Sequence, residues 1–492
     1  MSVKEPVSTK EFIEGIGGRL AKNKSEAYIR AVMAVEGRSN QFTARHMLVG
    51  DLAFVLSATE LGITPPDSAK AIVKCLLDMI PRAGELGRDN AVGDIVFQRE
   101  VWVADVVGRD TGAWQHIGRH RAESLRGYLP RMFFRDALCR EREAMLRLVR
   151  VLVDKAAPVL SAYAPVYHHL QHAGYTTLGE YLLGFAENLS DHIERFAQIE
   201  QRLDYAPPAH SGRPVLVKLA ERASQRLGFK RVQLLRQQGH LTEEQFSEPF
   251  FALVLPTVAM ARMAEDLRLW MTPEFDFFEL ADEHASISSG LPQKKNPFGL
   301  QAIIGGAAVG AGRIAGQLAS NIALSSEADT VYHMGSLFQY ANDVVHWTEF
   351  LAEIIERGTF NLPELERKSK WGYAGASEAM DTLIFDHGLP QRVAHHMLGA
   401  IVRAAVGGAD QEALLAQLKP ELAEHPGIDA QRILGILKGE ILLDTAINIP
   451  AAKTMHRNLE QKLQVLEKQV YRNEVADAAN RLLEEGRRFC AR

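Results

Sequence analysis

The sequence has few cysteines and no excess of basic charge. Three cysteines occur among 492 residues, and Cys75, Cys139 and Cys490 lie far apart. This sparse, odd-numbered set argues against a disulfide framework or a cysteine-based metal site, and it fits a reducing compartment such as the cytosol. Lysine and arginine number 56 against 61 aspartates and glutamates, which gives a net charge of -5. Because a nucleic-acid-binding protein normally presents a basic face, we expect no nucleic-acid partner.

Long apolar runs without polar interruption are also lacking. The first six residues are polar and contain no apolar core of a secretory signal, so we expect a cytoplasmic protein. The most apolar long segment, Leu300 to Leu324, would place polar side chains at bilayer depth, which is costly. These side chains are Gln301, Arg313, Gln317 and Asn321. Glycines four residues apart let helices approach closely, so the segment predicts a buried bundle helix and no membrane partner.

Alternating polar and apolar residues, typical of half-buried strands, form no convincing run. Helical spacing dominates: stripes with apolar residues every three or four positions begin at Met145, Leu178 and Met455. The longest stripe continues through Leu182, Phe185, Leu189, Ile193 and Phe196. Sparse Pro- and Gly-rich breaks leave helices of roughly 20 to 30 residues, longer than the globular mean of about 11 or 12. Long helices with short connections are typical of a bundle, so we predict an all-α fold.

The breaks also indicate how the chain divides. Proline- or glycine-rich punctuation lies at residues 84–93, 205–214, 273–297 and 358–363. We predict three helical domains: an N-terminal domain over residues 1–117, a central long-helix bundle over 118–367 and a C-terminal domain over 368–492. No internal repeat of fixed period is visible, which argues against a solenoid.

Two local patterns resemble sites of other kinds. The run from Gly310 to Ala315 matches a dinucleotide-binding fingerprint in its letters, but it lies inside a helical stretch, whereas that fingerprint needs a preceding strand. Histidines are dense in two places, His116 with His120, and His168 with His169 and His172. Histidines four apart on a helix can ligate a metal, but no nearby carboxylate or cysteine completes an obvious set. We therefore expect no metal, and histidines that line a polar active site.

The segment from Ser286 to Pro297 reads Ser-Ile-Ser-Ser-Gly-Leu-Pro-Gln-Lys-Lys-Asn-Pro between two helical stretches. An exposed polar loop is the plainest interpretation. Its letters, however, resemble the signature loop of the fumarase/aspartase superfamily, Gly-Ser-Ser-x-Met-Pro-x-Lys-x-Asn-Pro, with departures at Ile287 and Leu291. The version Pro-Gln-Lys-Lys-Asn-Pro is most similar to argininosuccinate lyase and its relative δ-crystallin.

The resemblance covers most of the chain. It includes Gly17 to Leu20, His116 to Ser124, Tyr167 to Gln171 and Ala264 to Leu267, which are similar to other motifs of that family. It implies a homotetramer in which three chains contribute to each site, a small carboxylate substrate and no cofactor. The family removes a proton next to a carboxylate and then expels an amine, so preorganised cations and donors must stabilise a carbanion.

The resemblance also implies residue roles. Ser288 is the base, His169 protonates or orients the leaving group, and Lys294 stabilises the carbanion. A serine is a poor base near neutral pH, so donors around the loop must stabilise its alkoxide, and loop closure would exclude water. The substrate-binding residues implied by the matched motifs are Arg121, His120, His168, Ser289, Asn296 and Gln301.

Several departures set this chain apart from argininosuccinate lyase. The family's Ser-Arg-Asn is replaced by His120-Arg121-Ala122, its Thr before the histidine by His168, and a Glu by Gln301. An amide cannot stabilise an imidazolium as a carboxylate does, which should weaken the acid–base role of His169. The residues that the family uses for the arginine portion are not recognisable near residues 328–333, so arginine production is not expected.

Three hypotheses follow for the function. The first is an active lyase on a succinyl-type or other carboxylated substrate with a different leaving group, because the main catalytic residue types are present. The second is a non-catalytic binding or structural protein on the same scaffold, as some crystallins are. The third is an addition or cyclisation enzyme that uses the same carbanion chemistry.

Overall fold

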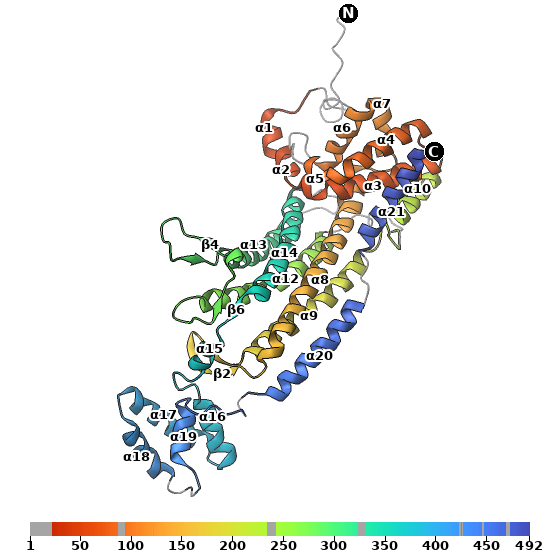
Figure 1. The fold of residues 1–492 in the computed structure, drawn as a ribbon. Helices are drawn as coiled ribbons and strands as arrows, with labels where there is room; N and C mark the ends of the chain where they lie inside the picture. The colour runs from red at the N-terminus through yellow and green to blue at the C-terminus, as the bar shows by residue number, and fades with distance from the viewer. Residues whose placement is uncertain are drawn as a thin grey trace, which may run out of the picture.

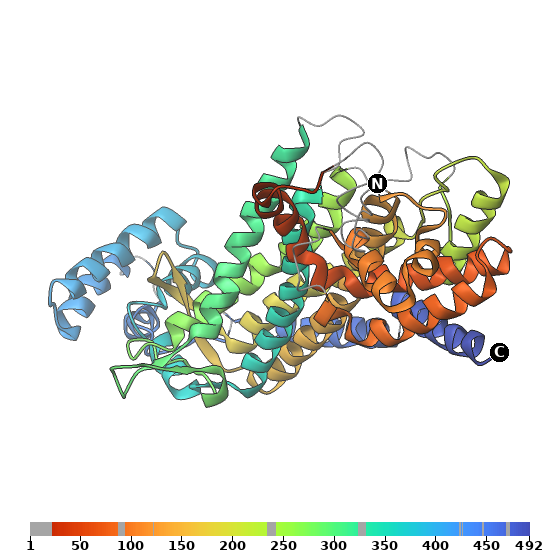
Figure 2. The same ribbon diagram turned by 90° about the horizontal axis from the view of Figure 1, so that it is seen from above.

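The computed structural model describes residues 22–86, 94–121, 123–233, 243–322, 331–422, 425, 427–444, 447–468 and 473–492. Over these residues the chain is built of helices, and the only sheets found have two strands each. Figures 1 and 2 show an elongated molecule, with helices gathered at the N-terminal end, long rods in the middle and a small helical group at the opposite end. The predicted all-α fold with a central long-helix bundle is confirmed.

The N-terminal helices enclose one hydrophobic core. Helix α3 (Asn40–Glu60) runs through its middle with most of its side chains buried, and α4 (Pro66–Met79) and α6 (Ile95–Val107) pack against it. Helices α10 (Pro214–Arg226) and α21 (Glu474–Ala491) join the same core from distant parts of the chain. The shorter elements here are α1 (Glu26–Tyr28), η2 (Ile29–Met33), α2 (Ala34–Glu36), η3 (Gly37–Ser39), η4 (Ile80–Arg82), α5 (Ala83–Leu86), α7 (Arg109–Gly112) and η6 (Ala113–His116).

The central bundle forms where the apolar stripes predicted it. Its long helices are α8 (Leu129–Ala156), α9 (Leu178–Leu203), α12 (Glu243–Trp270), α13 (Phe298–Ile322), α14 (Val331–Arg357) and α20 (Ile449–Lys468). Every member of the stripe from Leu178 to Phe196 is buried, so α9 turns one continuous face to the core. The π-helix η7 (Glu123–Tyr128) leads into α8, and η8 (Ala157–Val159) follows it.

Helix α13 is packed on one side only. A Cβ at Gly306 would lie 2.5 Å from the Trp347 ring of α14, so glycine is required for this close approach, as the glycine spacing predicts. By length and composition, residues Phe298–Ala319 could also cross a membrane, yet only 28% of this window is buried within the chain. The predicted burial of this helix is therefore incomplete in a single chain.

Three short antiparallel pairs, which the sequence did not reveal, interrupt the helices. They are β1 (Tyr163–His168) with β2 (Gln171–Thr177), β3 (Phe278–Glu279) with β6 (Thr359–Phe360), and β4 (Ser286–Ile287) with β5 (Lys295–Asn296). The helical turn η9 (Asp282–His284) precedes β4. Both the β1–β2 and β4–β5 pairs carry motifs that the sequence singled out.

A third core lies at the far end of the molecule (Figure 1). It follows α15 (Leu362–Ser369) and contains α16 (Ala376–Asp381), η10 (Thr382–Asp386), α17 (Gln391–Val406), α18 (Gln411–Leu422) and α19 (Ala430–Leu437). After it the chain returns, because α20 packs on the central bundle and α21 on the N-terminal core. The boundaries at 117/118 and 367/368 stay a prediction.

Candidate active site

The signature segment forms a hairpin loop that projects from the side of the bundle between η9 and α13 (Figure 1). Its tip is exposed, with Leu291 at 50% of its full accessibility. Its base is fixed by ion pairs: the Lys295 ammonium lies 2.7 Å from Asp282, and Arg357 lies 3.0 Å from Glu283. The Asp282 carboxylate raises the pKa of Lys295. The loop is therefore anchored at its base and open at its tip.

Ser288 lies within this tip and already receives hydrogen-bond donors. Its Oγ accepts hydrogen bonds from the backbone N–H groups of Leu291 at 3.1 Å and Gly290 at 3.4 Å. Donors aimed at this oxygen would stabilise negative charge on it, which is what a serine base needs. Ser289 beside it is exposed.

The two adjacent lysines of the loop differ in their surroundings. Lys295 is held by Asp282 and by Glu279, whereas the exposed Lys294 makes no ion pair with any residue that the structure describes. Asn296 is half-buried in β5, where it pairs with Ser286. The geometry thus gives Lys295 an anchoring role and leaves the ammonium of Lys294 exposed.

His168 and His169 lie at the exposed turn of the β1–β2 hairpin. The backbone of His169 and Leu170 has φ values of 53° and 60°, which matches a two-residue turn in which both central residues are left-handed. Non-glycine residues held this way are strained and are typical of functional sites. The Tyr167 ring packs 5.4 Å from that of Phe275, so the hairpin rests on the segment that leads to the signature loop.

His172, on β2 behind this turn, belongs to the supporting structure. Its ring lies 4.6 Å from that of Tyr167. Burial and the nearby Lys368 lower the pKa of His172, which favours its neutral form. We infer that His172 helps to hold the hairpin, while His168 and His169 face outward.

The segment 116–121 is fixed by a buried polar network. Arg119 and Arg99 pair with Asp51 at 2.6 and 2.8 Å, and all three side chains are almost fully buried. Burial alone would raise the pKa of Asp51, but the two guanidinium groups outweigh it and hold this pKa below its usual value. His116 pairs with Glu100 at the start of the segment, and burial lowers the pKa of His116. His116 is therefore structural.

Arg121 is presented at the end of this segment. Its Nε donates to Asp94 at 2.6 Å and its terminal nitrogen to Glu36 at 3.3 Å, yet one third of the side chain stays exposed. Asp94 also accepts from the backbone N–H groups that begin α6, so it is a rigid anchor for the guanidinium. Ala122 and the motif Gly17 to Leu20 lie outside the described residues, as do residues 328–330.

One chain holds these segments apart. Figure 1 shows α7, β4 and β2, which lie close in sequence to Arg121, Ser288 and His169 respectively, at different levels along the molecule. Gln301, expected near the histidine, is exposed in the first turn of α13. The predicted site residues are thus exposed or partly exposed, and the segments that carry them lie at different levels of one chain.

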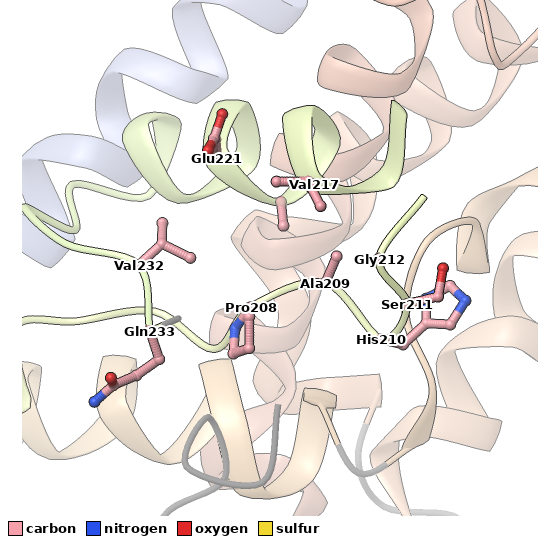
Figure 3. A pocket seen from close by; sticks show the side chains of 10 residues that line it. Pro208, Ala209, His210, Ser211, Gly212, Val217, Glu221, Val232 and Gln233 are labelled. Atoms are coloured by element: carbon pink, nitrogen blue, oxygen red, sulfur yellow. The ribbon is translucent and has the colours of Figure 1, made fainter. Parts of the chain in front are cut away.

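Sequence reasoning missed His210. Its ring lies 4.3 Å from that of His120, centroid to centroid, although the two residues are ninety positions apart. His210 also lines a cavity of about 370 Å³, and Figure 3 shows it with Ser211 at one end of this space, with Val217 and Glu221 of α10 across from Pro208. The only signal in the sequence is a histidine inside the break at residues 205–214.

A family model described as lyase matches residues 53–312, which is more than half of the chain. The argininosuccinate lyase of Anaeromyxobacter sp. (strain K) is 31% identical over 381 residues, which cover 75% of this chain and 79% of that protein. The argininosuccinate lyase of Methanoculleus marisnigri is 26% identical over 511 residues, with 96% and 98% covered. A crystal structure of EDDS lyase in complex with formate superposes with a TM-score of 0.76 at 21% identity, covering 92% of this chain and 93% of the other.

The sequence motifs, the helical bundle and these similarities agree. The chain belongs to the lyase family of the fumarase/aspartase superfamily, and within it the chain is similar to the argininosuccinate lyases. It is an enzyme of the carbon–nitrogen lyase type.

Proposed function

We propose that this protein catalyses β-elimination from a succinyl-type carboxylated substrate, most simply by C–N cleavage, and releases fumarate or a related unsaturated acid. The observation that carries the proposal is the Ser288 hydroxyl, which sits at the open tip of an anchored loop with two backbone N–H groups on its oxygen. The second support is the neighbouring Lys294, whose ammonium is left available for a carboxylate.

In this proposal the Ser288 alkoxide takes the proton from the carbon next to a carboxylate. Lys294 and Asn296 stabilise the electron pair left on that carbon as it spreads into the carboxylate. The pair then forms the double bond as the C–N bond breaks, and His169 delivers a proton to the departing nitrogen. Arg121, His120, His168, Ser289 and Gln301 bind the substrate.

We further propose a cytoplasmic homotetramer whose sites are shared between chains. Its support is the uncovered apolar face of α12 and α13, where a groove of about 380 Å³ is lined by Val258, Ala261, Arg262, Glu265, Ile304, Ala307, Ala308 and Ala311. An exposed patch of this kind marks an interaction site, and a second copy of the bundle offers a matching apolar face. Association through this face would bring together segments that one chain keeps apart.

The test is fumarate release by the purified protein from a panel of C–N adducts of fumarate with different amines. We expect turnover of at least one adduct, its loss in Ser288→Ala, and no such loss in the control Ser286→Ala from the same loop. Because Ser288 lies in an open loop, the stability of Ser288→Ala should stay within about 0.5 kcal/mol of the wild type.

Each of the other outcomes of this test points to a different base or to one of the other two hypotheses. If Ser288→Ala keeps more than a tenth of the rate, another residue is the base. If no adduct, addition or cyclisation substrate is converted, the non-catalytic hypothesis replaces this one. Products that lack fumarate would favour the addition or cyclisation hypothesis.

A further inference from the structure

One aromatic ring of α14 contacts both ends of the signature loop. Where the loop begins, the His284 ring of η9 packs edge-on to the Phe350 ring, with centroids 5.4 Å apart and planes inclined by 89°. Where the loop ends, a Cβ at Gly299 would overlap the same Phe350 ring, so the ring lies directly against the backbone of α13. Ser288 lies on the loop between these two points. The two ends of the loop are therefore held against a single side chain.

His284 is buried at this contact without a completed hydrogen bond. Its side chain is only 4% exposed, and its Nε2 lies 3.5 Å from a carboxylate oxygen of Glu353, on the next turn of α14. This is an ion-pair distance, but neither ring nitrogen makes a hydrogen bond with any residue that the structure describes. A buried donor without an acceptor is destabilising. Packing alone therefore does not explain a histidine here, because a phenylalanine would fill the same space without that cost.

Glu353 is held in place as an acceptor for this imidazole. Its other carboxylate oxygen lies 3.8 Å from the guanidinium of Arg147 on α8. The pKa of Arg357, one turn further along α14, is raised by Glu283 of η9 and by Glu353. An approach of about 0.7 Å between η9 and α14 would turn the 3.5 Å contact of His284 into a charge-assisted hydrogen bond of about 2.8 Å.

The contact lies where a small movement reaches the catalytic loop. Strand β4 begins two residues after His284, and Ser286 of this strand pairs with Asn296 of β5. The strand pair joins the two sides of the loop, and its tip carries Ser288 and Lys294. A displacement of η9 relative to α14 therefore moves both of these side chains.

We propose that His284 is a positioning residue of this enzyme, which sets the place of Ser288 by holding η9 to Glu353 and Phe350 of α14. This inference rests on the proposed function, because that function makes Ser288 the base. His284 itself touches no reacting atom. Its loss should therefore slow the removal of the proton more than it weakens the binding of the substrate.

His284→Phe keeps a ring against Phe350 and removes both nitrogens. We expect its kcat for fumarate release to fall by about tenfold or more, because a displacement of about 1 Å at the reacting atoms can cost about a hundredfold. KM should change less than kcat. The urea midpoint at fixed protein concentration should be at least that of the wild type, since no unpaired nitrogen is buried any longer. A merely structural role would give the reverse, a lower midpoint with kcat unchanged.

Two further variants examine the contact itself. His284→Gln keeps a side-chain donor and should restore part of the kcat lost in His284→Phe. Glu353→Ala removes the acceptor and should lower kcat as His284→Phe does. The variant with both His284→Phe and Glu353→Ala should be no slower than the slower single variant, because both changes remove the same contact.

The matched control is a second imidazole–carboxylate pair that lies wholly on α14. His346 and Glu349 are 3.7 Å apart on this helix. His346→Phe and Glu349→Ala should leave kcat as it is in the wild type. Light scattering on each variant identifies any that fails to assemble, and if His284→Phe fails, Glu353→Ala against Glu349→Ala supplies the comparison.

Hydrogen exchange on the full chain tests the contact without turnover. Backbone amides of residues 285–298 should exchange faster in His284→Phe and Glu353→Ala than in the wild type, and no faster in the two control variants. Unchanged exchange in both, kcat within about twofold of the wild type in both, or an equal fall of kcat in the controls overturns the inference. A wild-type protein that converts no adduct refutes the proposed function instead, while the exchange differences still support the contact.

Discussion

At the scale of single residues, neighbouring side chains of the same type have different surroundings. Lys295 is used by ion pairs at the base of the signature loop while Lys294 is not, and His116 and His172 support the fold while His168 and His169 face outward. The family resemblance gave Lys294 and His169 their expected roles, but the residues themselves contained no signal for the supporting roles of Lys295, His116 and His172. Their partners elsewhere in the chain distinguish them, because Lys295 pairs with Asp282 and His116 pairs with Glu100.

Residues at the substrate end of the site lead to a prediction about argininosuccinate. Where the family has the compact neutral side chains Ser and Asn, this chain has His120 and Ala122, and His168 replaces a threonine. Loss of a donor to a charged group costs about 1.5 to 3 kcal/mol, which is roughly a ten- to a hundredfold loss. We expect negligible cleavage of argininosuccinate by the purified protein in a fumarate-release assay. Arginine and fumarate production at the rates of ordinary metabolic enzymes would contradict this.

At the scale of helices and hairpins, the sequence predicted what depends on local spacing. The buried face of α9 follows from its apolar stripe, and the close contact of α13 with α14 follows from glycines four apart. The β1–β2 hairpin was not predicted, because its turn uses His169 and Leu170 in place of the usual asparagine and glycine. The stacking of His120 on His210 was also missed, since it depends on how two segments ninety residues apart pack together.

The contact of α8 with α14 leads to a prediction about pH. Glu141 of α8 is completely buried, its Oε1 lies 2.7 Å from the Thr348 hydroxyl of α14, and burial raises its pKa to about 8. Because the pKa of Glu141 is higher in the folded protein than in the unfolded chain, the bound proton stabilises the fold. This contribution to the free energy of unfolding is full below about pH 4.5 and is lost as the pH rises to about 8. The loss amounts to roughly 3 to 5 kcal/mol at 1.36 kcal/mol per pKa unit.

Glu141→Gln should remove this pH dependence. Urea unfolding at fixed protein concentration measures this dependence. It is followed between about pH 5 and 8.5, the interval over which most of the stabilisation should be lost. The exposed Glu143→Gln on the same helix is the control and should keep the dependence of the wild type. Identical pH profiles for Glu141→Gln and the wild type would show that Glu141 does not carry the buried proton.

At the scale of the whole molecule, the described helices form three large hydrophobic cores within one chain, whereas the proposed site depends on more than one chain. The groove of α12 and α13 stays uncovered, and the candidate catalytic segments lie at different levels. The sequence could indicate shared sites only through its family resemblance, because no local pattern reveals how chains associate.

The uncovered face gives a prediction about assembly. Val309 on α13 is half exposed, and a charge there would be buried without a partner in the proposed homotetramer. We expect Val309→Asp to lower the mass found by light scattering at micromolar concentration and to abolish turnover together with it. Val406→Asp, at a 75% exposed valine of α17, is the control and should change neither. A monomeric wild-type protein would refute the proposed assembly.

The most direct test of the account is complementation between two inactive variants. Ser288→Ala and His169→Ala each remove one catalytic group, and each protein alone should be inactive. Co-expression with different tags allows mixed tetramers to be purified, and if the two groups in one site come from different chains, about a quarter of the sites regain both by random mixing. The account predicts fumarate release at roughly a quarter to a third of the wild-type rate from the purified mixed tetramers. Mixed tetramers that stay as inactive as either variant alone would contradict it.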